Sequence, residues 1–134
     1  MTAITALLLF AALPLVLTSI YVGHRVAMVL TRGVPADSWT RGSTTTVPGI
    51  ALRAQHAQLN CLENLPVFIA IVVAAQVLGR GALVDSVAPW ILLARLAQTT
   101  THLIGVSHWL VQIRAAFFTI QVVLFLYVIL RLLP

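Results

Sequence analysis

Ionisable and amide side chains gather in one stretch of an otherwise apolar chain, between residues 53 and 66. In a helix, where successive residues turn by about 100°, several of these side chains fall within about 100° of one another. They are Arg53, His56, Asn60, Glu63 and Asn64. Lipid cannot solvate such a polar stripe, so it must face other helices or a water-filled cavity. The stripe is therefore a candidate binding site.

Two later segments also carry polar residues at helical spacing. They contain Arg95, Gln98 and His102, and then Arg114 with Phe118 and Gln121. Glu63 is the only acid inside an expected membrane span, and an interior arginine is costly without an anionic partner. One acid cannot neutralise Arg53, Arg95 and Arg114 together. Because guanidinium groups grip carboxylates in bidentate fashion, the excess of arginine predicts an anionic ligand with carboxylates.

Two other interpretations of these residues stay open. Glu63 can pair with an arginine while Asn60 bonds to a neighbouring helix, which would make the stripe a structural polar core. Lipid phosphates are the simplest competing partner for Arg53 and Arg114, because both lie near the expected membrane interface. Metal binding is not expected, since no pair of histidines shares a helix face with an acid at a ligand spacing.

The composition places the chain in a membrane. Of its 134 residues, 60% are hydrophobic and 8% are charged, against about 25% charged in ordinary soluble domains. With a mean hydropathy of +1.04, one small domain could not hide its apolar surface from water. The arginines give a formal charge of +5 but are scattered between apolar runs, so nucleic-acid binding is not expected.

The apolar runs predict an all-α membrane protein with four transmembrane helices in an up-down bundle. At about 20 apolar residues per crossing, the chain has room for four spans and no second domain. We expect one domain over residues 1–134, with helices at about 3–30, 48–78, 84–105 and 109–133. Pro14 should kink the first helix. The glycines, prolines and hydroxyl residues of 31–47 predict a loop.

The arginines also predict an orientation. The loops after the first and third helices lie on the side that holds Arg32 and Arg41, with Arg25, Arg53 and Arg114 nearby, whereas Arg80 and Arg131 lie on the other side. Loops rich in arginine face the cytoplasm. Both termini are therefore expected on the non-cytoplasmic side.

The segment from Arg53 to Phe68, RAQHAQLNCLENLPVF, resembles the second-helix signature of the MAPEG family, the membrane-associated proteins in eicosanoid and glutathione metabolism, and especially its bacterial branch. The core of that signature is Asn60-x-x-Glu63 followed by Pro66 and Phe68. The resemblance extends to chain length, the four spans and the third-helix pattern of Arg95, Gln98 and His102. It implies a homotrimer that binds glutathione between neighbouring subunits, in a bacterial inner membrane.

The resemblance also implies roles for the polar residues. Asn60 and Glu63 would hold glutathione, Glu63 through the amino group, and the carboxylates would be bound by Arg53 and Arg95. Arg114 would be the catalytic residue, because a nearby guanidinium lowers the pKa of a thiol from about 8.5 and raises its thiolate fraction. The remaining members of the implied glutathione site are His56, Asn64, Gln98 and His102.

Four positions depart from the family pattern. Many members carry arginine where this chain has His56, and tyrosine where it has Asn64. The third-helix tyrosines of the mammalian enzymes correspond to Gln98 and His102.

Three functions are compatible with this sequence. The first is a glutathione-dependent transferase or peroxidase that acts on lipophilic electrophiles, with glutathione or another small anionic thiol as co-substrate. The alternative is a non-catalytic membrane protein that binds lipids or acts as a scaffold. The third is a small proton-coupled exporter with Glu63 as its carrier acid, against which the three inward-facing arginines argue.

Overall fold

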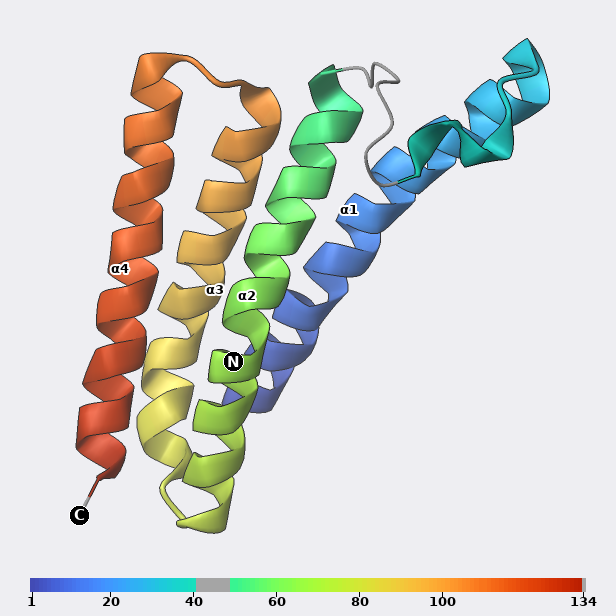
Figure 1. The fold of residues 1–134 in the computed structure, drawn as a ribbon. Coiled ribbons are helices and arrows are strands. Elements are labelled where there is room, and N and C mark those ends of the chain that lie inside the picture. Colours follow the sequence, from blue (N-terminus) through green and yellow to red (C-terminus); the bar gives the residue numbers. More distant parts are fainter. Residues whose placement is uncertain (41–48, 134) are drawn as a thin grey trace.

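The structure, a computed structural model, describes residues 1–40 and 49–133 and contains four long helices (Figure 1). They are α1 (Ala3–Arg32), α2 (Gly49–Val77), α3 (Gly81–Ile104) and α4 (His108–Leu132). A short 3-10 helix, η1 (Ala36–Trp39), follows α1. The described ranges contain no strand. The prediction of an all-α protein with four helices is confirmed.

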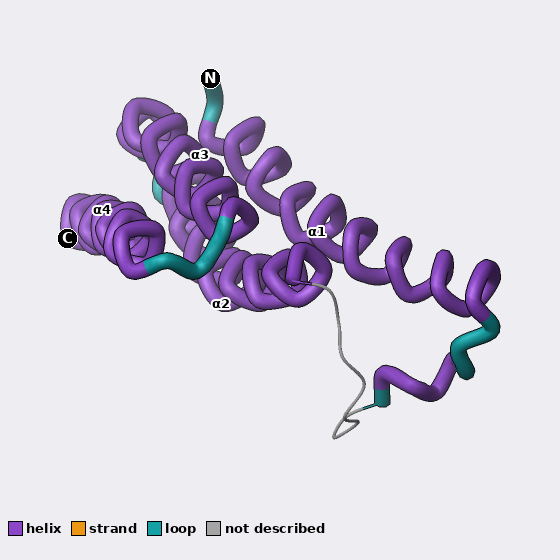
Figure 2. The backbone as a smooth tube through the Cα atoms, turned by 90° about the horizontal axis from the view of Figure 1, so that it is seen from above, coloured by secondary structure: helices purple, strands orange, loops and turns teal. Residues whose placement is uncertain are grey.

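The helices run alternately up and down, and α3 contacts each of the other three (Figure 1). Seen from above, α1 and α4 lie on opposite sides of α2 and α3 (Figure 2). Short connections produce this order, because α2 and α3 are joined through residues 78–80 and α3 and α4 through residues 105–107. An even number of crossings brings the two termini to the same end of the bundle.

Three of the helices, α1, α2 and α4, are long and apolar enough to cross a membrane. The helix α3 has fewer apolar residues because its second half carries buried polar side chains, which are Arg95, Gln98, Thr99, Thr101 and His102. It runs alongside the apolar helices (Figure 2), and these side chains are buried. The chain is therefore an all-α integral membrane protein.

Aromatic rings join three of the helices at the centre of the apolar core. The ring centroids of Phe10 and Phe68 are 5.6 Å apart, and those of Phe68 and Phe125 are 5.9 Å apart. The buried residues of α1 all lie in its first half and end at Leu17. Beyond that residue, α1 diverges from the bundle toward η1 (Figure 1).

Side chains from other elements close two helix ends at the end of the bundle that holds the termini. The Asp85 carboxylate accepts a hydrogen bond from the Ala3 backbone N–H at 2.6 Å, at the positive end of α1. Arg80 donates from Nη1 to the carbonyl oxygens of Arg131 and Leu132, at 3.0 and 3.3 Å, where α4 ends. These contacts tie α1 to α3 and the α2–α3 turn to α4.

The structure differs from the expected elements in two places. The helix α3 begins at Gly81, not near residue 84, because Gly79 adopts a left-handed conformation with φ 64° and completes the turn early. The expected loop 31–47 contains η1. Residues 41–48, which include Arg41 and the expected helix start at Pro48, lie outside the described residues.

Candidate functional site

The side chain of Asn60 lies at the centre of a polar cluster shared by α2, α3 and α4. Its Oδ1 accepts hydrogen bonds from Arg95 Nη1 at 3.3 Å and from Gln98 Nε2 at 3.4 Å. Because both donors approach the oxygen, the amide nitrogen of Asn60 is left for other partners. The backbone carbonyl of Asn60 accepts a further hydrogen bond from Asn64 Nδ2 at 3.3 Å.

Arg95 is a buried cation whose hydrogen-bond partners among the described residues are uncharged. Only 1% of its surface is exposed. Besides Asn60, its guanidinium donates to Gln121 Oε1 on α4, and it lies 5.1 Å from the centroid of the Phe10 ring. Gln121 in turn donates to the Ile91 carbonyl at 3.5 Å. Amide dipoles and an aromatic face therefore supply the stabilisation that an acid would otherwise give.

A hollow of about 220 Å³ opens beside this cluster, between α2, α3 and α4. It is lined by Asn60, Glu63, Gln98, Val111, Arg114, Ala115 and Phe118. Glu63 is exposed and Arg114 is half-buried. The hydrogen bonds found within the described residues do not use the Glu63 carboxylate or the Arg114 guanidinium. The hollow thus presents one acid and one cation, both available to a ligand.

Gln98, one of the residues that line the hollow, has an unsatisfied acceptor. Its Oε1 atom is buried and has no hydrogen-bond partner among the described residues, while its Nε2 is bound to Asn60. A buried acceptor without a donor is costly. An N–H group of a bound molecule could satisfy it.

The other residues of the expected site lie around the hollow without lining it. Arg53 is half-buried, and its Nε donates to the Leu103 carbonyl on α3 at 2.8 Å. His56 is exposed and His102 is buried, with their ring centroids 6.4 Å apart. Asn64 is buried. The structure therefore brings Asn60, Glu63, Gln98 and Arg114 together as lining residues of one hollow, whereas Arg53, His56 and His102 are not among its lining residues.

The aromatic partner of Arg95 is not evident from the sequence. Phe10 lies in the apolar first half of α1, and one phenylalanine among leucines and alanines gives no signal of an interaction with an arginine on α3. Val111 and Ala115 were missed as well. Val111 precedes Arg114 by three residues and so shares its face of α4, whereas Ala115 follows Arg114 directly. A helical projection around Arg114 would have found Val111.

Comparison with known proteins gives one match. A sequence model of the MAPEG family matches residues 2–133. No curated protein and no solved structure matches the chain.

Proposed function

The chain belongs to the MAPEG family, and from this premise we propose that it is a glutathione-dependent transferase or peroxidase that acts on lipophilic electrophiles. The observation that carries the proposal is the hollow that Glu63, Arg114, Asn60 and Gln98 line together. Glutathione has an amino group, two carboxylates, peptide N–H groups and a thiol. The hollow offers a partner for each class of group.

The roles follow from the charges of the lining residues. Glu63 accepts the ammonium group of glutathione, and Gln98 Oε1, which lacks a donor, accepts a peptide N–H. The Asn60 amide donates to a carbonyl or carboxylate, because its oxygen is already bound to Arg95 and Gln98. Arg53 uses only its Nε for Leu103, so its terminal nitrogens serve a carboxylate at the edge of the site.

Arg95 is better suited to support this site than to touch the ligand. Its guanidinium is buried and donates to Asn60 and Gln121. It therefore orients the Asn60 amide and adds positive potential behind it. Asn64, His56 and His102 complete the surroundings of the site.

Arg114 is the catalytic residue of this proposal. Its guanidinium stabilises the thiolate of glutathione, which lowers the pKa of the thiol and raises the thiolate fraction near neutral pH. The thiolate sulfur then attacks an electrophilic carbon that enters from the bilayer. With a chloro-nitrobenzene, the C–S bond forms, the C–Cl bond breaks, chloride leaves, and the thiol proton passes to water.

The size of the hollow supports an oligomer. Its volume of about 220 Å³ is below the range of roughly 300–1,000 Å³ that is usual for ligand pockets. Glu63 and His56 are exposed in the single chain. A second copy that packs against this face would enlarge and close the site, and we propose the homotrimer that the family resemblance implies.

The same reasoning gives a location in the membrane. Both termini lie at one end of the bundle together with Arg80 and Arg131. Arg25, Arg32 and Arg53 lie toward the other end. With arginine-rich ends facing the cytoplasm, we propose a bacterial inner-membrane protein whose termini and glutathione site are on opposite sides of the bilayer.

Thermal unfolding of the detergent-solubilised protein tests the proposal. Millimolar glutathione should raise the melting temperature, because a ligand that binds only the folded state stabilises it. Glu63→Gln and Arg114→Ala should each abolish most of this shift. The matched control is Arg32→Gln, an exposed arginine outside the hollow, which should keep the full shift.

Turnover separates binding from catalysis. Conjugation of a chloro-nitrobenzene should fall by about two orders of magnitude in Arg114→Ala if this guanidinium stabilises the developing charge on sulfur. Unchanged turnover would remove Arg114 from the thiol-activating role. No melting shift with the unmodified protein would contradict glutathione binding and favour a non-catalytic lipid-binding protein.

A further inference from the structure

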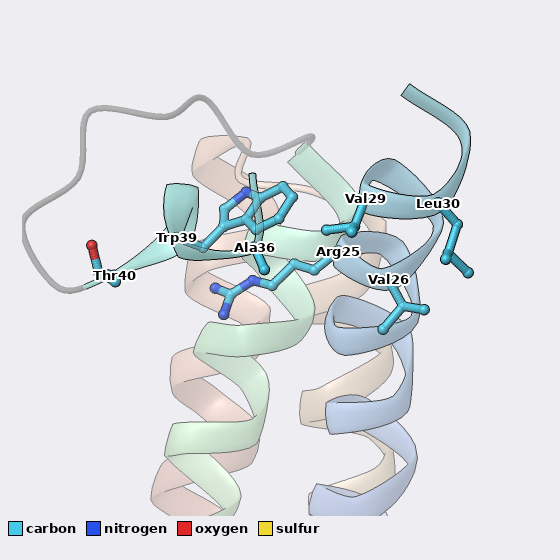
Figure 3. A pocket seen from close by; sticks show the side chains of 7 residues that line it. All are labelled: Arg25, Val26, Val29, Leu30, Ala36, Trp39 and Thr40. Carbon is cyan, nitrogen blue, oxygen red and sulfur yellow. The ribbon is translucent and has the colours of Figure 1, made fainter. Parts of the chain in front are cut away.

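A second hollow lies far from the glutathione site, where the last turns of α1 meet η1 (Figure 3). Its volume is about 350 Å³, and its lining residues are Arg25, Val26, Val29, Leu30, Ala36, Trp39 and Thr40. Arg25 extends across it toward η1, and the Trp39 indole lies above the guanidinium side chain (Figure 3). The hollow therefore combines an apolar wall with a single cation.

The guanidinium of Arg25 is held in place but only partly satisfied. It lies 5.3 Å from the centroid of the Tyr21 ring, and its Nη2 donates to Gln55 Oε1 on α2 over a long distance of 3.5 Å. Its Nε is buried and has no partner among the described residues. Its Nη1 makes no hydrogen bond with the described residues either, so at least one donor is left for a ligand acceptor.

No acid of the described chain occupies that position. Glu63 lines the other hollow, and Asp85 binds the start of α1 at the opposite end of the bundle. Asp37 belongs to η1 but is exposed and does not line the hollow. An anion from outside the chain is the natural partner of Arg25.

The depth of Arg25 identifies the source of that anion. From Ala3 to Arg25, α1 rises by about 33 Å at 1.5 Å per residue, slightly more than the roughly 30 Å of a hydrocarbon core. Arg25 and Trp39 therefore reach the level of lipid headgroups, where tryptophan is enriched. Val26, Val29 and Leu30 line the hollow beside the cation and can contact an acyl chain.

We propose that this hollow binds an anionic phospholipid. The phosphate accepts hydrogen bonds from the Arg25 guanidinium, which matches phosphate geometry, and part of one acyl chain lies against Val29 and Trp39. The site is independent of the proposed glutathione chemistry, because it shares no lining residue with that hollow.

Fluorescence quenching by brominated lipids tests this site directly. A variant with Trp90→Phe and Trp109→Phe leaves Trp39 as the one tryptophan. It is reconstituted in vesicles of equal parts phosphatidylcholine and phosphatidylglycerol, with bromine on the acyl chains of one lipid or of the other. An arginine near the surface favours anionic lipid by about fivefold, so bromine on phosphatidylglycerol should quench Trp39 about that much more effectively.

Matched variants separate this site from the general attraction of lipid to positive charge. Arg25→Gln should remove the preference, whereas Arg32→Gln, at the same helix end but outside the hollow, should keep it. Val29→Phe retains the cation and fills the apolar wall, so it should also reduce the preferential quenching. Trp90 as the sole tryptophan should be quenched equally by both lipids.

Three outcomes would overturn the proposal. Equal quenching of Trp39 by both brominated lipids would show no anion site. Equal losses in Arg25→Gln and Arg32→Gln would show a diffuse charge effect. No quenching of Trp39 by either lipid would show that protein, such as a second copy of the chain, covers the hollow. Circular dichroism of each variant confirms that the helices are retained.

Discussion

At the level of single residues, the environment of Arg95 explains how a membrane protein can bury a cation without an acid. The guanidinium donates to two amide oxygens, on Asn60 and Gln121, and stacks near Phe10. Each amide is itself oriented by another hydrogen bond, through Gln98 and the Ile91 carbonyl. Several dipoles on three helices thus stabilise the charge. Because both donors approach the Asn60 oxygen, the amide nitrogen of Asn60 remains free.

A double-mutant cycle on Arg95 and Gln121 tests this arrangement. Arg95→Met should destabilise the fold by about 1–3 kcal/mol, since it leaves the buried Gln121 amide oxygen without a donor. In Arg95→Met/Gln121→Leu both polar groups are gone. Gln121→Leu should therefore lower the free energy of unfolding less in the Arg95→Met background than in the wild-type protein. We expect a coupling of about 1 kcal/mol, measured by denaturant unfolding in detergent.

A distant pair provides the control for this cycle. Arg95→Met combined with Asp85→Ala should be additive, because Asp85 bonds to the start of α1. Additive energies for Arg95 and Gln121 themselves would show that their hydrogen bond contributes no net stability.

At the level of elements, α1 is fixed at its start and diverges at its end. Its buried residues end at Leu17, and its first free N–H group is bound by Asp85 of α3. Thr2 adds a local cap, with its side chain accepting from the Thr5 N–H at 3.2 Å. The contact with Asp85 therefore determines where α1 joins the bundle.

Replacing Asp85 tests the importance of this contact. Asp85→Ala should lower the free energy of unfolding by about 1 kcal/mol, because it removes both a cap and a negative charge from the positive end of α1. Asp85→Asn keeps an acceptor and should lose less. Asp37→Ala, which removes an exposed acid on η1, should change stability by less than about 0.5 kcal/mol. Equal effects of the two alanine variants would assign the loss to net charge.

The elements were predictable because their signals are local. Long apolar runs separated by Gly79-Arg80-Gly81 and by the turn at 105–107 indicate spans without any knowledge of packing. The turn at Gly79 was harder to place, because a left-handed glycine can close a helix in one residue. The sequence did not predict the 3-10 helix at Ala36–Trp39, because the proline and glycine nearby favoured a loop.

At the level of the whole molecule, the candidate site was only partly predictable, because it depends on how the packed helices are rotated about their axes. Helical spacing places Asn60, Glu63 and Asn64 on one stripe, yet Asn64 is buried while Glu63 is exposed. In lipid the inner and outer faces of a helix are both apolar, so periodicity does not reveal its rotation about its axis. The positions of Gln98 and Arg114 at the same hollow depend on that rotation in all three helices.

The position of the two charged residues in one chain predicts how the proposed oligomer builds its sites. Glu63 and Arg114 of the same chain line one hollow, so in the proposed trimer each copy would supply both charges to its own site and the neighbour would close it. The purified complex should contain three chains of 14.5 kDa each, as native mass spectrometry can establish. A single chain in lipid would contradict the trimer without affecting the family assignment.

Mixed complexes decide whether the two charges act within one chain. When copies with Glu63→Gln are co-expressed with copies carrying Arg114→Ala, no hollow contains both native residues, so glutathione binding should stay as low as in either variant alone. As a control, wild-type copies mixed with copies that carry both changes should bind in proportion to the wild-type share. Recovery of binding in the first mixture would mean that Arg114 of one copy serves Glu63 of its neighbour, because only then could two defective chains build an intact site.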